Sequence, residues 1–322
     1  MICMEDLLQL SIKHIHEQLK QKQISAKELA ELCLGRINQR DKDLNAFITP
    51  TPELAVKQAA EIDKKIARNE EIPLLAGIPC SIKDSILVDG VVCTAGSRIL
   101  ENYIAPYNAT VVQRLLDQGI AIVGKTNMDE FSMGASTENS AFGPTKNPHD
   151  TSRVAGGSSG GAAASVAALQ ALVALGEDTG GSIRLPASFC GVAGLKPTYG
   201  AVSRHGVVAL VSSLDQVGPL GRTVEDCEIV FDAIRGRDPL DSTSLNHEYN
   251  MQDNKYKIQD LRIGIPNEYF TEGIDAKVEQ VIRDAIHKLE QAGAKIEEIT
   301  LPHTKYALAA YYLINTSEAS AN

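Results

Sequence analysis

The sequence predicts an α/β fold, in which helices cover both faces of a central β-sheet. From Gly77 onward, short apolar segments of strand length alternate with segments whose apolar residues recur at helical spacing. Such alternation is typical of a sheet layered between helices. A chain of 322 residues can bury a large core, and we expect a single domain over residues 1–322. Within it, residues 1–70 are predicted to form a mainly helical segment.

The N-terminal segment carries three helix signals. Apolar residues at three- and four-residue spacing predict a helix from about Glu5 to Leu19. Ser25 and Glu28 have the spacing of a capping box, so a second helix is expected to begin there and run to about residue 39. Thr51-Pro52 predicts the N-cap and the first residue of a third helix.

The rest of the chain supplies the alternating elements. Short apolar runs predict strands at Ile78–Ile86, Ile120–Val123, Ala171–Leu175 and Leu261–Ile265. Helical spacing, alanine content and capping residues predict helices at Thr110–Leu116, Ala162–Ala168, Thr223–Ile234, from Asp275 to Gly293, and Tyr306–Asn322. The polar segment Asp238–Lys257 is predicted to be a surface excursion.

Charge and composition exclude several classes of protein. The net charge of −10 has the wrong sign for a chain that grips nucleic-acid phosphates by itself. The six cysteines have no metal-binding spacing and are expected to be reduced, mostly buried thiols. No apolar run reaches the length of a membrane span, so we expect a cytoplasmic protein that does not bind membranes.

Two glycine-rich turns that contain serine are the strongest candidates for a functional site. The first, Gly156–Gly161, includes Ser158 and lies just before the alanine-rich helix; the second, Asp178–Ser182, follows a predicted strand. Glycines allow successive backbone N–H groups to point at one place, which suits a developing oxyanion. Such turns are more often ordinary loops, but two of them separated by one helix and one strand can face each other.

A lysine on a strand-like segment could complete the site. Lys83 lies between Ile82 and Asp84 in an apolar neighbourhood. A free lysine has a pKa of about 10.4, so burial would have to lower the pKa before this amine could act as a base near neutral pH. A lysine at this place is otherwise a solvated edge residue.

These motifs resemble the amidase signature family. The strings Gly-Gly-Ser-Ser-Gly-Gly and Asp-Thr-Gly-Gly-Ser-Ile-Arg-Leu-Pro, together with the upstream Ile-Lys-Asp, carry the resemblance. It implies a mixed central sheet and a Ser-cis-Ser-Lys triad, with Ser182 as nucleophile, Ser158 as bridging serine after a cis peptide bond, and Lys83 as base.

The resemblance also implies which residues contact the substrate. The backbone N–H groups of Thr179 to Ser182, which include those of Gly180 and Gly181, are expected to hold the substrate's oxyanion. Ser132 and Gly134 are expected to lie in the substrate site as well.

Within the family, the stretches 124–134 and 136–143 resemble the glutaminase subunits of tRNA-dependent amidotransferases. This implies that the chain releases ammonia from glutamine for the conversion of Glu-tRNA(Gln) to Gln-tRNA(Gln), with Asp-tRNA(Asn) left open as the acceptor. It also implies the amidotransferase subunits B and C as partners, with tRNA bound mainly through the larger of them. ATP and Mg²⁺ are expected in that partner, and no cofactor or metal in this chain.

Three other interpretations compete with this one. The chain could be a free-standing amidase acting on another small amide. Residues Gly119–Thr126 match the pattern of a phosphate-binding loop and would make an ATP-binding module, although their apolar interior predicts a strand. Ser159 matches the nucleophile position of an α/β-hydrolase elbow, but residues 148–153 before it do not predict the strand that such an elbow requires.

The last helix ends at Asn322 without a closing glycine or proline. Because members of the resembled family continue further, we expect a C-terminally incomplete domain whose glutamine-specificity residues lie beyond Asn322. A complete triad with little glutaminase activity is the expected consequence.

Overall fold

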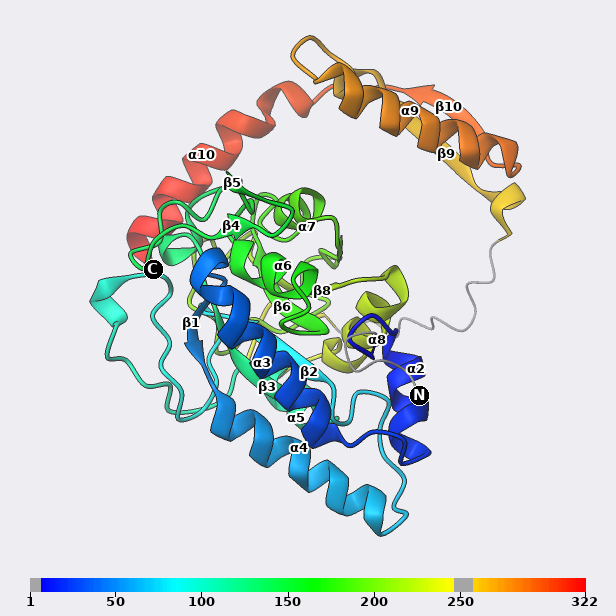
Figure 1. The fold of residues 1–322 in the computed structure, drawn as a ribbon. Coiled ribbons are helices and arrows are strands. Elements are labelled where there is room, and N and C mark those ends of the chain that lie inside the picture. Colours follow the sequence, from blue (N-terminus) through cyan, green and yellow to red (C-terminus); the bar gives the residue numbers. More distant parts are fainter. Residues whose placement is uncertain (1–6, 246–256) are drawn as a thin grey trace. The chain divides into compact units, whose positions relative to one another are not determined.

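The computed structural model describes residues 7–245 and 257–322 (Figure 1). The chain forms two compact units. The larger unit comprises Met1–His247 and Glu318–Asn322, and the smaller comprises Glu248–Ser317. The single-domain organisation expected from the sequence stays a prediction.

A six-stranded mixed sheet forms the centre of the larger unit. Its strand order is β1-β3-β2-β6-β8-β7. Strand β2 runs parallel to both β3 and β6, whereas β1, β8 and β7 join antiparallel to their neighbours. The α/β class with a mixed sheet is therefore confirmed. The strands span Phe47–Pro50 (β1), Pro79–Lys83 (β2), Ala121–Thr126 (β3), Val173–Asp178 (β6), Ala193–Gly194 (β7) and Gln216–Gly221 (β8).

Helices lie on both faces of this sheet, as the connections require. The chain passes from β2 through α5 (Thr110–Asp117) to β3 on one side, and from β3 through α6 (Gly160–Ala167) to β6 on the other side of β2. Since such crossovers are right-handed, two crossovers in opposite directions place their helices on opposite faces. Helix α8 (Val224–Ile234) packs against α5 and β8, and α7 (Arg184–Cys190) packs against α6.

Burial on both faces explains the composition of the inner strands. Every residue of β2, β3, β6 and β8 is buried. Parallel strands covered on both sides read as continuous apolar runs rather than as alternating patterns. This is why the runs near residues 78, 120 and 171 could be recognised from the sequence. The polar side chains on the same strands, such as Lys83 and Lys125, must then find partners inside the protein.

The N-terminal segment is mainly helical over its described residues, with two corrections. Helix α2 covers Ile12–Lys20, and Ser11 caps it by accepting from the N–H of His14. The helix predicted to be continuous from about Glu5 is interrupted, because residues 8–11 are not helical. Helix α3 (Ala26–Leu44) begins with the predicted capping box but runs five residues past the expected end. It packs against α4 and against strands β2 and β3.

The third helix, α4 (Pro52–Ala67), begins at Pro52 as expected. Thr51 occupies the N-cap position as predicted, but its hydroxyl does not cap the helix and donates to the carbonyl oxygen of Ile122 at 2.8 Å instead. A contact to the neighbouring strand therefore replaces the local cap, which sequence spacing alone does not reveal.

One further expectation is wrong for the described residues, and another, the surface excursion from Asp238, holds for most of them. Residues 150–154 do form a strand, β5 (Asp150–Val154), which pairs with β4 (Lys146–Asn147) in a separate exposed hairpin. The segment predicted as a surface excursion begins with two buried carboxylates, Asp238 and Asp241, that anchor hydrogen bonds. Its residues 246–256 lie outside the described residues.

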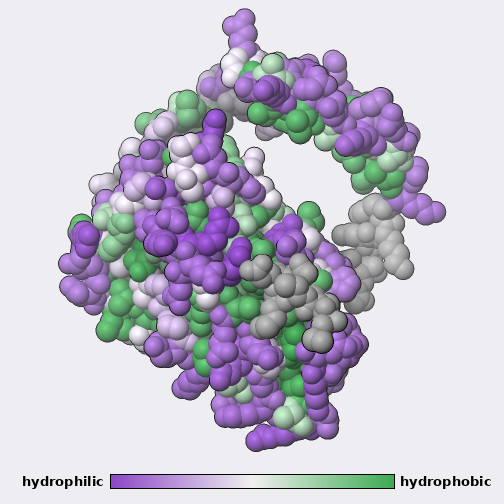
Figure 2. All heavy atoms as spheres, in the orientation of Figure 1, coloured by the Kyte–Doolittle hydropathy of each residue, from purple (hydrophilic) through white to green (hydrophobic). Residues whose placement is uncertain are grey.

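The smaller unit contains a parallel pair of strands joined by a helix, and most of the last helix also belongs to it. Strand β9 (Arg262–Pro266) pairs with β10 (Lys295–Ile299), and α9 (Ala276–Gln291) connects them. The side chain of Asp275 caps α9 as predicted, accepting from the N–H groups of Lys277 and Val278. Hydrophobic side chains remain exposed along α9, at Val278, Val281, Ile282 and Leu289, and Figure 2 shows hydrophobic residues among hydrophilic ones in this part of the chain. The last helix, α10, spans Thr304–Ala321, close to its predicted bounds.

The remaining sequence expectations concern cysteines and membranes. Five cysteines are free and buried, at residues 33, 80, 93, 190 and 227, while Cys3 lies outside the described residues. No helix within residues 7–245 and 257–322 is long and apolar enough to cross a bilayer.

Candidate active site

Lys83 and Ser158 meet in the interior of the larger unit. Lys83 ends strand β2 and is fully buried, and its ammonium nitrogen Nζ donates to the Ser158 hydroxyl oxygen at 2.8 Å. Ser158 lies in the turn before α6, and the Gly157–Ser158 peptide bond is cis, as predicted. The structure thus brings together the lysine and the first serine that the sequence placed 75 residues apart.

Ser182 joins them from the second glycine turn. The N–H of Ser159 donates to the carbonyl oxygen of Ser182 at 3.1 Å, which ties the two turns together. Ser182 keeps 7% of its surface exposed. Its hydroxyl makes no hydrogen bond within residues 7–245 and 257–322, so the oxygen is free to attack a substrate.

A carboxylate that the sequence reasoning missed shapes the second turn. Asp178 accepts from the N–H of Gly181 at 2.8 Å and from that of Ile183 at 3.0 Å. It also pairs with the guanidinium of Arg184, with contacts of 2.9 and 3.1 Å. Burial acts to raise the pKa of Asp178, but these hydrogen bonds, above all that from Arg184, outweigh burial and hold the pKa below its ordinary value. The acid immediately before the Thr-Gly-Gly string was the available signal.

The backbone N–H groups of the second turn that have no partner among the described residues are available to bind a substrate. Because Gly181 donates to Asp178, its N–H is occupied. Within the described part of the chain, those of Thr179, Gly180 and Ser182 have no hydrogen-bond partner. The Thr179 hydroxyl donates to Asp215 at 2.6 Å, which fixes the side chain of the turn's first residue. The turn can therefore present unpaired donors to an oxyanion beside Ser182.

The environment of Lys83 suits a proton acceptor. Burial lowers the pKa of Lys83, and the carboxylates of Glu177, Asp215, Asp129 and Asp178 act in the opposite direction. The sequence left open whether Lys83 is desolvated, and in the structure its side chain is fully buried. Asp215 is itself affected: burial, followed by the charge of Glu177, raises the pKa of Asp215 to about 6 against the hydrogen bonds that it accepts.

In the structure, Ser132 contacts Glu177 and Gly134 packs against Asp129. The Ser132 hydroxyl donates to Glu177 at 2.8 Å and the residue is 2% exposed. A Cβ atom at Gly134 would lie 2.2 Å from Cγ of Asp129, so only glycine fits there. Ser132 and Gly134 therefore contact acidic side chains that lie near the triad. Substrate contact by either residue stays a prediction.

Glycines of the first turn allow close packing around Ser158. A Cβ atom at Gly157 would meet Oδ2 of Asp129 at 2.2 Å, and one at Gly161 would meet the carbonyl oxygen of Ala46 at 2.3 Å. Asp129 also accepts from the N–H of Thr137 at 2.9 Å. Its carboxylate is thus fixed beside the turn that carries Ser158.

Two competing interpretations lose support from this geometry. Ser159 is fully buried, and its hydroxyl donates to the carbonyl oxygen of Glu177 at 3.1 Å, so it is not presented as an elbow nucleophile. Residues 121–126 are the buried strand β3, paired on its two sides with β1 and β2, so their N–H groups cannot wrap a triphosphate. The ATP-binding interpretation of Gly119–Thr126 is therefore wrong.

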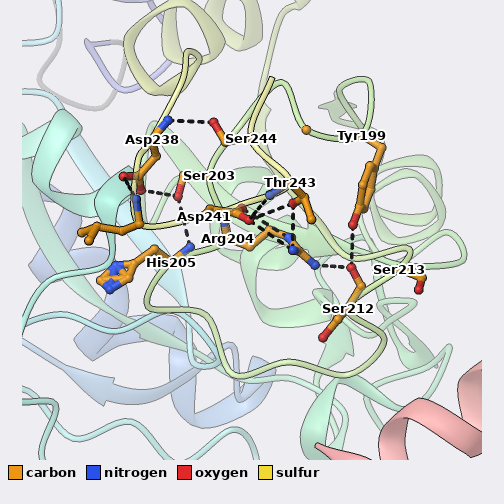
Figure 3. A network of polar contacts seen from close by, with 12 residues as sticks. Tyr199, Ser203, Arg204, His205, Ser212, Ser213, Asp238, Asp241, Thr243 and Ser244 are labelled. Atoms are coloured by element: carbon orange, nitrogen blue, oxygen red, sulfur yellow. Dashed lines mark hydrogen bonds and ion pairs between the residues drawn. The ribbon is translucent and has the colours of Figure 1, made fainter. Parts of the chain in front are cut away.

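A polar network supports the loop that carries Asp215 (Figure 3). The Arg204 guanidinium contacts Asp241, Thr243 and the carbonyl oxygen of Ser212, and the Tyr199 hydroxyl donates to that same carbonyl oxygen at 2.8 Å. An open cavity of about 220 Å³ lies beside it, lined in part by Arg204, Asp215 and Asp241. Because its guanidinium is hydrogen-bonded to these groups, Arg204 holds the loop in place.

No group of three or more His, Cys, Asp or Glu side chains in the described ranges is arranged to hold a metal ion. The site's reactive groups are instead an amine, two hydroxyls and backbone N–H groups. Such a set is suited to nucleophilic attack on a carbonyl carbon.

A sequence model of the Amidase family matches residues 28–322. This chain belongs to the amidase family. Among its relatives, the A subunit of the glutamyl-tRNA(Gln) amidotransferase of Carboxydothermus hydrogenoformans is 56% identical over 319 residues, which cover 98% of this amidase chain and 66% of that relative. The chain therefore spans slightly less than two thirds of that relative's length.

Solved structures agree with the family assignment. The crystal structure of the A subunit of glutamyl-tRNA(Gln) amidotransferase from Thermotoga maritima superposes with a TM-score of 0.86 at 42% identity, covering 98% of this amidase chain and 67% of that one. The peptide amidase from Stenotrophomonas maltophilia superposes with a TM-score of 0.87 at 32% identity, covering 97% of this chain and 66% of that one. The fold is thus shared by amidases of different substrates.

Proposed function

We propose that this amidase is the glutaminase subunit of a tRNA-dependent amidotransferase. The observation that carries the proposal is the buried contact between Lys83 and Ser158, together with the backbone hydrogen bond that ties the turn of Ser158 to Ser182. Similarity at 56% identity to the A subunit of a glutamyl-tRNA(Gln) amidotransferase favours glutamine as the amide and Glu-tRNA(Gln) as the final acceptor of its ammonia.

In the proposed reaction, the Ser182 hydroxyl oxygen attacks the side-chain carboxamide carbon of glutamine. Its proton passes to Ser158, which gives its own proton to neutral Lys83. The ammonium of Lys83 then returns a proton through Ser158 to the departing nitrogen, so ammonia leaves and an ester to Ser182 remains. Water, activated by the same base, hydrolyses the ester and releases glutamate.

Backbone donors stabilise the charge that develops on the carbonyl oxygen. The unpaired N–H groups of Thr179, Gly180 and Ser182 are the candidates, since that of Gly181 is taken by Asp178. Loss of one such donor in comparable sites costs about 2.7–4 kcal/mol of transition-state stabilisation. Asp178 and Arg184 would keep the turn rigid for this purpose.

The proposal assigns the remaining steps to the amidotransferase subunits B and C. The B subunit would use ATP and Mg²⁺ to activate the misacylated tRNA, and the small C subunit would hold the two larger ones together. The net charge of −10 agrees with RNA being held mainly by a partner. A cytoplasmic location is part of the same proposal.

Replacing Ser182 by alanine tests the nucleophile. We expect Ser182→Ala to abolish covalent labelling by a diazoketone analogue of glutamine and to reduce glutamine hydrolysis by about 10³-fold or more. Intact-mass measurement of the chain in complex with subunits B and C is the readout. Ser188→Ala, at an exposed position in α7, is the matched control and should label normally. Persistent labelling of Ser182→Ala would remove Ser182 from the mechanism.

A free-standing amidase for another small amide is the alternative, and likeness to the peptide amidase gives it a specific basis. Competition separates the two. Glutamine should protect Ser182 from the electrophile at millimolar concentration, and peptide amides should not. The opposite pattern of protection would favour the alternative and overturn glutamine as substrate.

A further inference from the structure

A buried carboxylate lies beside the amine of Lys83. Glu177 is fully buried near the end of β6, where it pairs in register with Val217 of β8. Its Oε2 atom is 3.6 Å from Nζ of Lys83. The next residue, Asp178, points to the glycine turn instead, as expected for neighbours on a strand.

Two hydroxyl groups hold this carboxylate in place. Ser85 and Ser132 each donate to Oε2 of Glu177 at 2.8 Å. An ionised carboxylate can accept both of these hydrogen bonds at once. A protonated carboxyl group has a single O–H, so it could donate to only one of the two serines. Ser132 adopts φ of 63°, in the left-handed region that favours glycine, to reach this position. Oε1 is buried and has no hydrogen-bond partner among the described residues.

Lys83 is the cation that pairs with Glu177, because the other cations nearby have carboxylate partners of their own. Lys125 donates to Asp84, and Arg184 pairs with Asp178, so both of these cations are committed elsewhere. When Lys83 gives up its proton, Glu177 becomes a buried charge without a counter-ion, which is unfavourable. Asp215, Asp129 and Asp178 also face Lys83 and add to the effect.

We propose that Glu177 is a positioning residue that stabilises the ammonium form of Lys83 and so sets the lower pH limit of the amidase reaction. The inference rests on the proposed function, because it needs Lys83 as the base. The carboxylate favours uptake of the proton from Ser158 during attack and opposes loss of that proton from the resting enzyme. Without it, Lys83 would be neutral at lower pH.

The test is the pH dependence of labelling in Glu177→Gln. The chain in complex with subunits B and C is treated with the diazoketone analogue of glutamine between about pH 6 and pH 10, and the rate of labelling at Ser182 is followed by intact mass. We expect the lower limb of the wild-type profile to move down by about 1–3 pH units in the variant, the range for loss of an opposite charge at this distance. A limb that stays in place or moves up would overturn the proposal.

Two controls make the result specific. Glu101→Gln changes an exposed carboxylate outside the site and should leave the limb unchanged. Ser85→Ala removes one donor to Oε2, so the carboxylate is less stable and the limb should move down by less than in Glu177→Gln. If Glu177→Gln does not fold, as judged by circular dichroism, this second variant decides the question, and an unchanged limb in Ser85→Ala then overturns the proposal.

The same data separate this inference from the proposed function. Absence of labelling at Ser182 in the wild-type complex would contradict the triad itself. Labelling with identical profiles in wild type and Glu177→Gln would leave the triad intact and remove only the role of Glu177.

Discussion

Two fully buried lysines on neighbouring strands have different partners. Lys125 of β3 donates directly to Oδ1 of Asp84 at 3.0 Å. Lys83 of β2 contacts a hydroxyl, Ser158, at 2.8 Å, and its nearest carboxylate oxygen is 3.6 Å away. Both side chains have no exposed surface. The two sites therefore share burial and differ in what the amine touches.

The difference separates a structural cation from a reactive one. A carboxylate accepts hydrogen bonds only, so Asp84 serves Lys125 as a partner that holds the amine in place. The backbone N–H of Thr94 donates to Asp84 at 2.8 Å as well, and its hydroxyl does so too. A hydroxyl can both donate and accept, so Ser158 can pass a proton to Lys83 and take it back. Burial alone does not make a lysine a base.

The largest effect is expected from breaking the Lys125–Asp84 pair. Lys125→Met should lower the free energy of unfolding by about 3–5 kcal/mol, because it leaves Asp84 as a buried charge without its cation. Denaturant unfolding followed by circular dichroism is the measurement. The double variant Asp84→Asn/Lys125→Met should recover part of that loss. A single variant as stable as wild type would show that the pair is not a structural anchor.

The second effect is catalytic and belongs to Lys83. In a chain extended to the length of its relatives, Lys83→Met should reduce glutamine hydrolysis by about 10²–10⁴-fold, the usual contribution of a general base, while the fold is retained. Lys83→Arg should be equally inactive, since a guanidinium does not become neutral. Steady-state rates with subunits B and C, together with unfolding curves, provide the comparison. Near-normal turnover of Lys83→Arg would exclude the base role.

The smallest effect is a pH dependence of stability. Because burial lowers the pKa of Lys83 below 10.5, the unfolded chain binds more protons than the folded chain between these two pKa values. The free energy of unfolding of wild type relative to Lys83→Met should therefore rise with pH in that window, by at most about 1.4 kcal/mol per pH unit. Below the lowered pKa both states are protonated and the difference should be flat. A difference that falls with pH would mean that the pKa is raised.

Local patterns in the sequence determined most elements and the identity of the reactive side chains. The capping box of Ser25 and Glu28 and the cap Asp275 depend on contacts within one turn, so spacing was sufficient to place them. Buried strands appeared as apolar runs because both faces of the sheet are covered. The two glycine turns and Lys83 carried enough of the family's pattern to predict the triad positions and the cis bond before Ser158.

Only the tertiary structure decided which distant groups meet. The hydroxyl of Thr51 turned from its helix to the carbonyl oxygen of Ile122, and β5 formed by pairing with β4 despite its polar sequence. Glu177 reached Lys83 and Ser132 from strand β6, and Asp178 occupied the N–H of Gly181. These contacts depend on strand order and on side-chain direction across the sheet. The spacing of residues along one sequence does not reveal these contacts. Each contact forms only after strands that are distant in the sequence have paired.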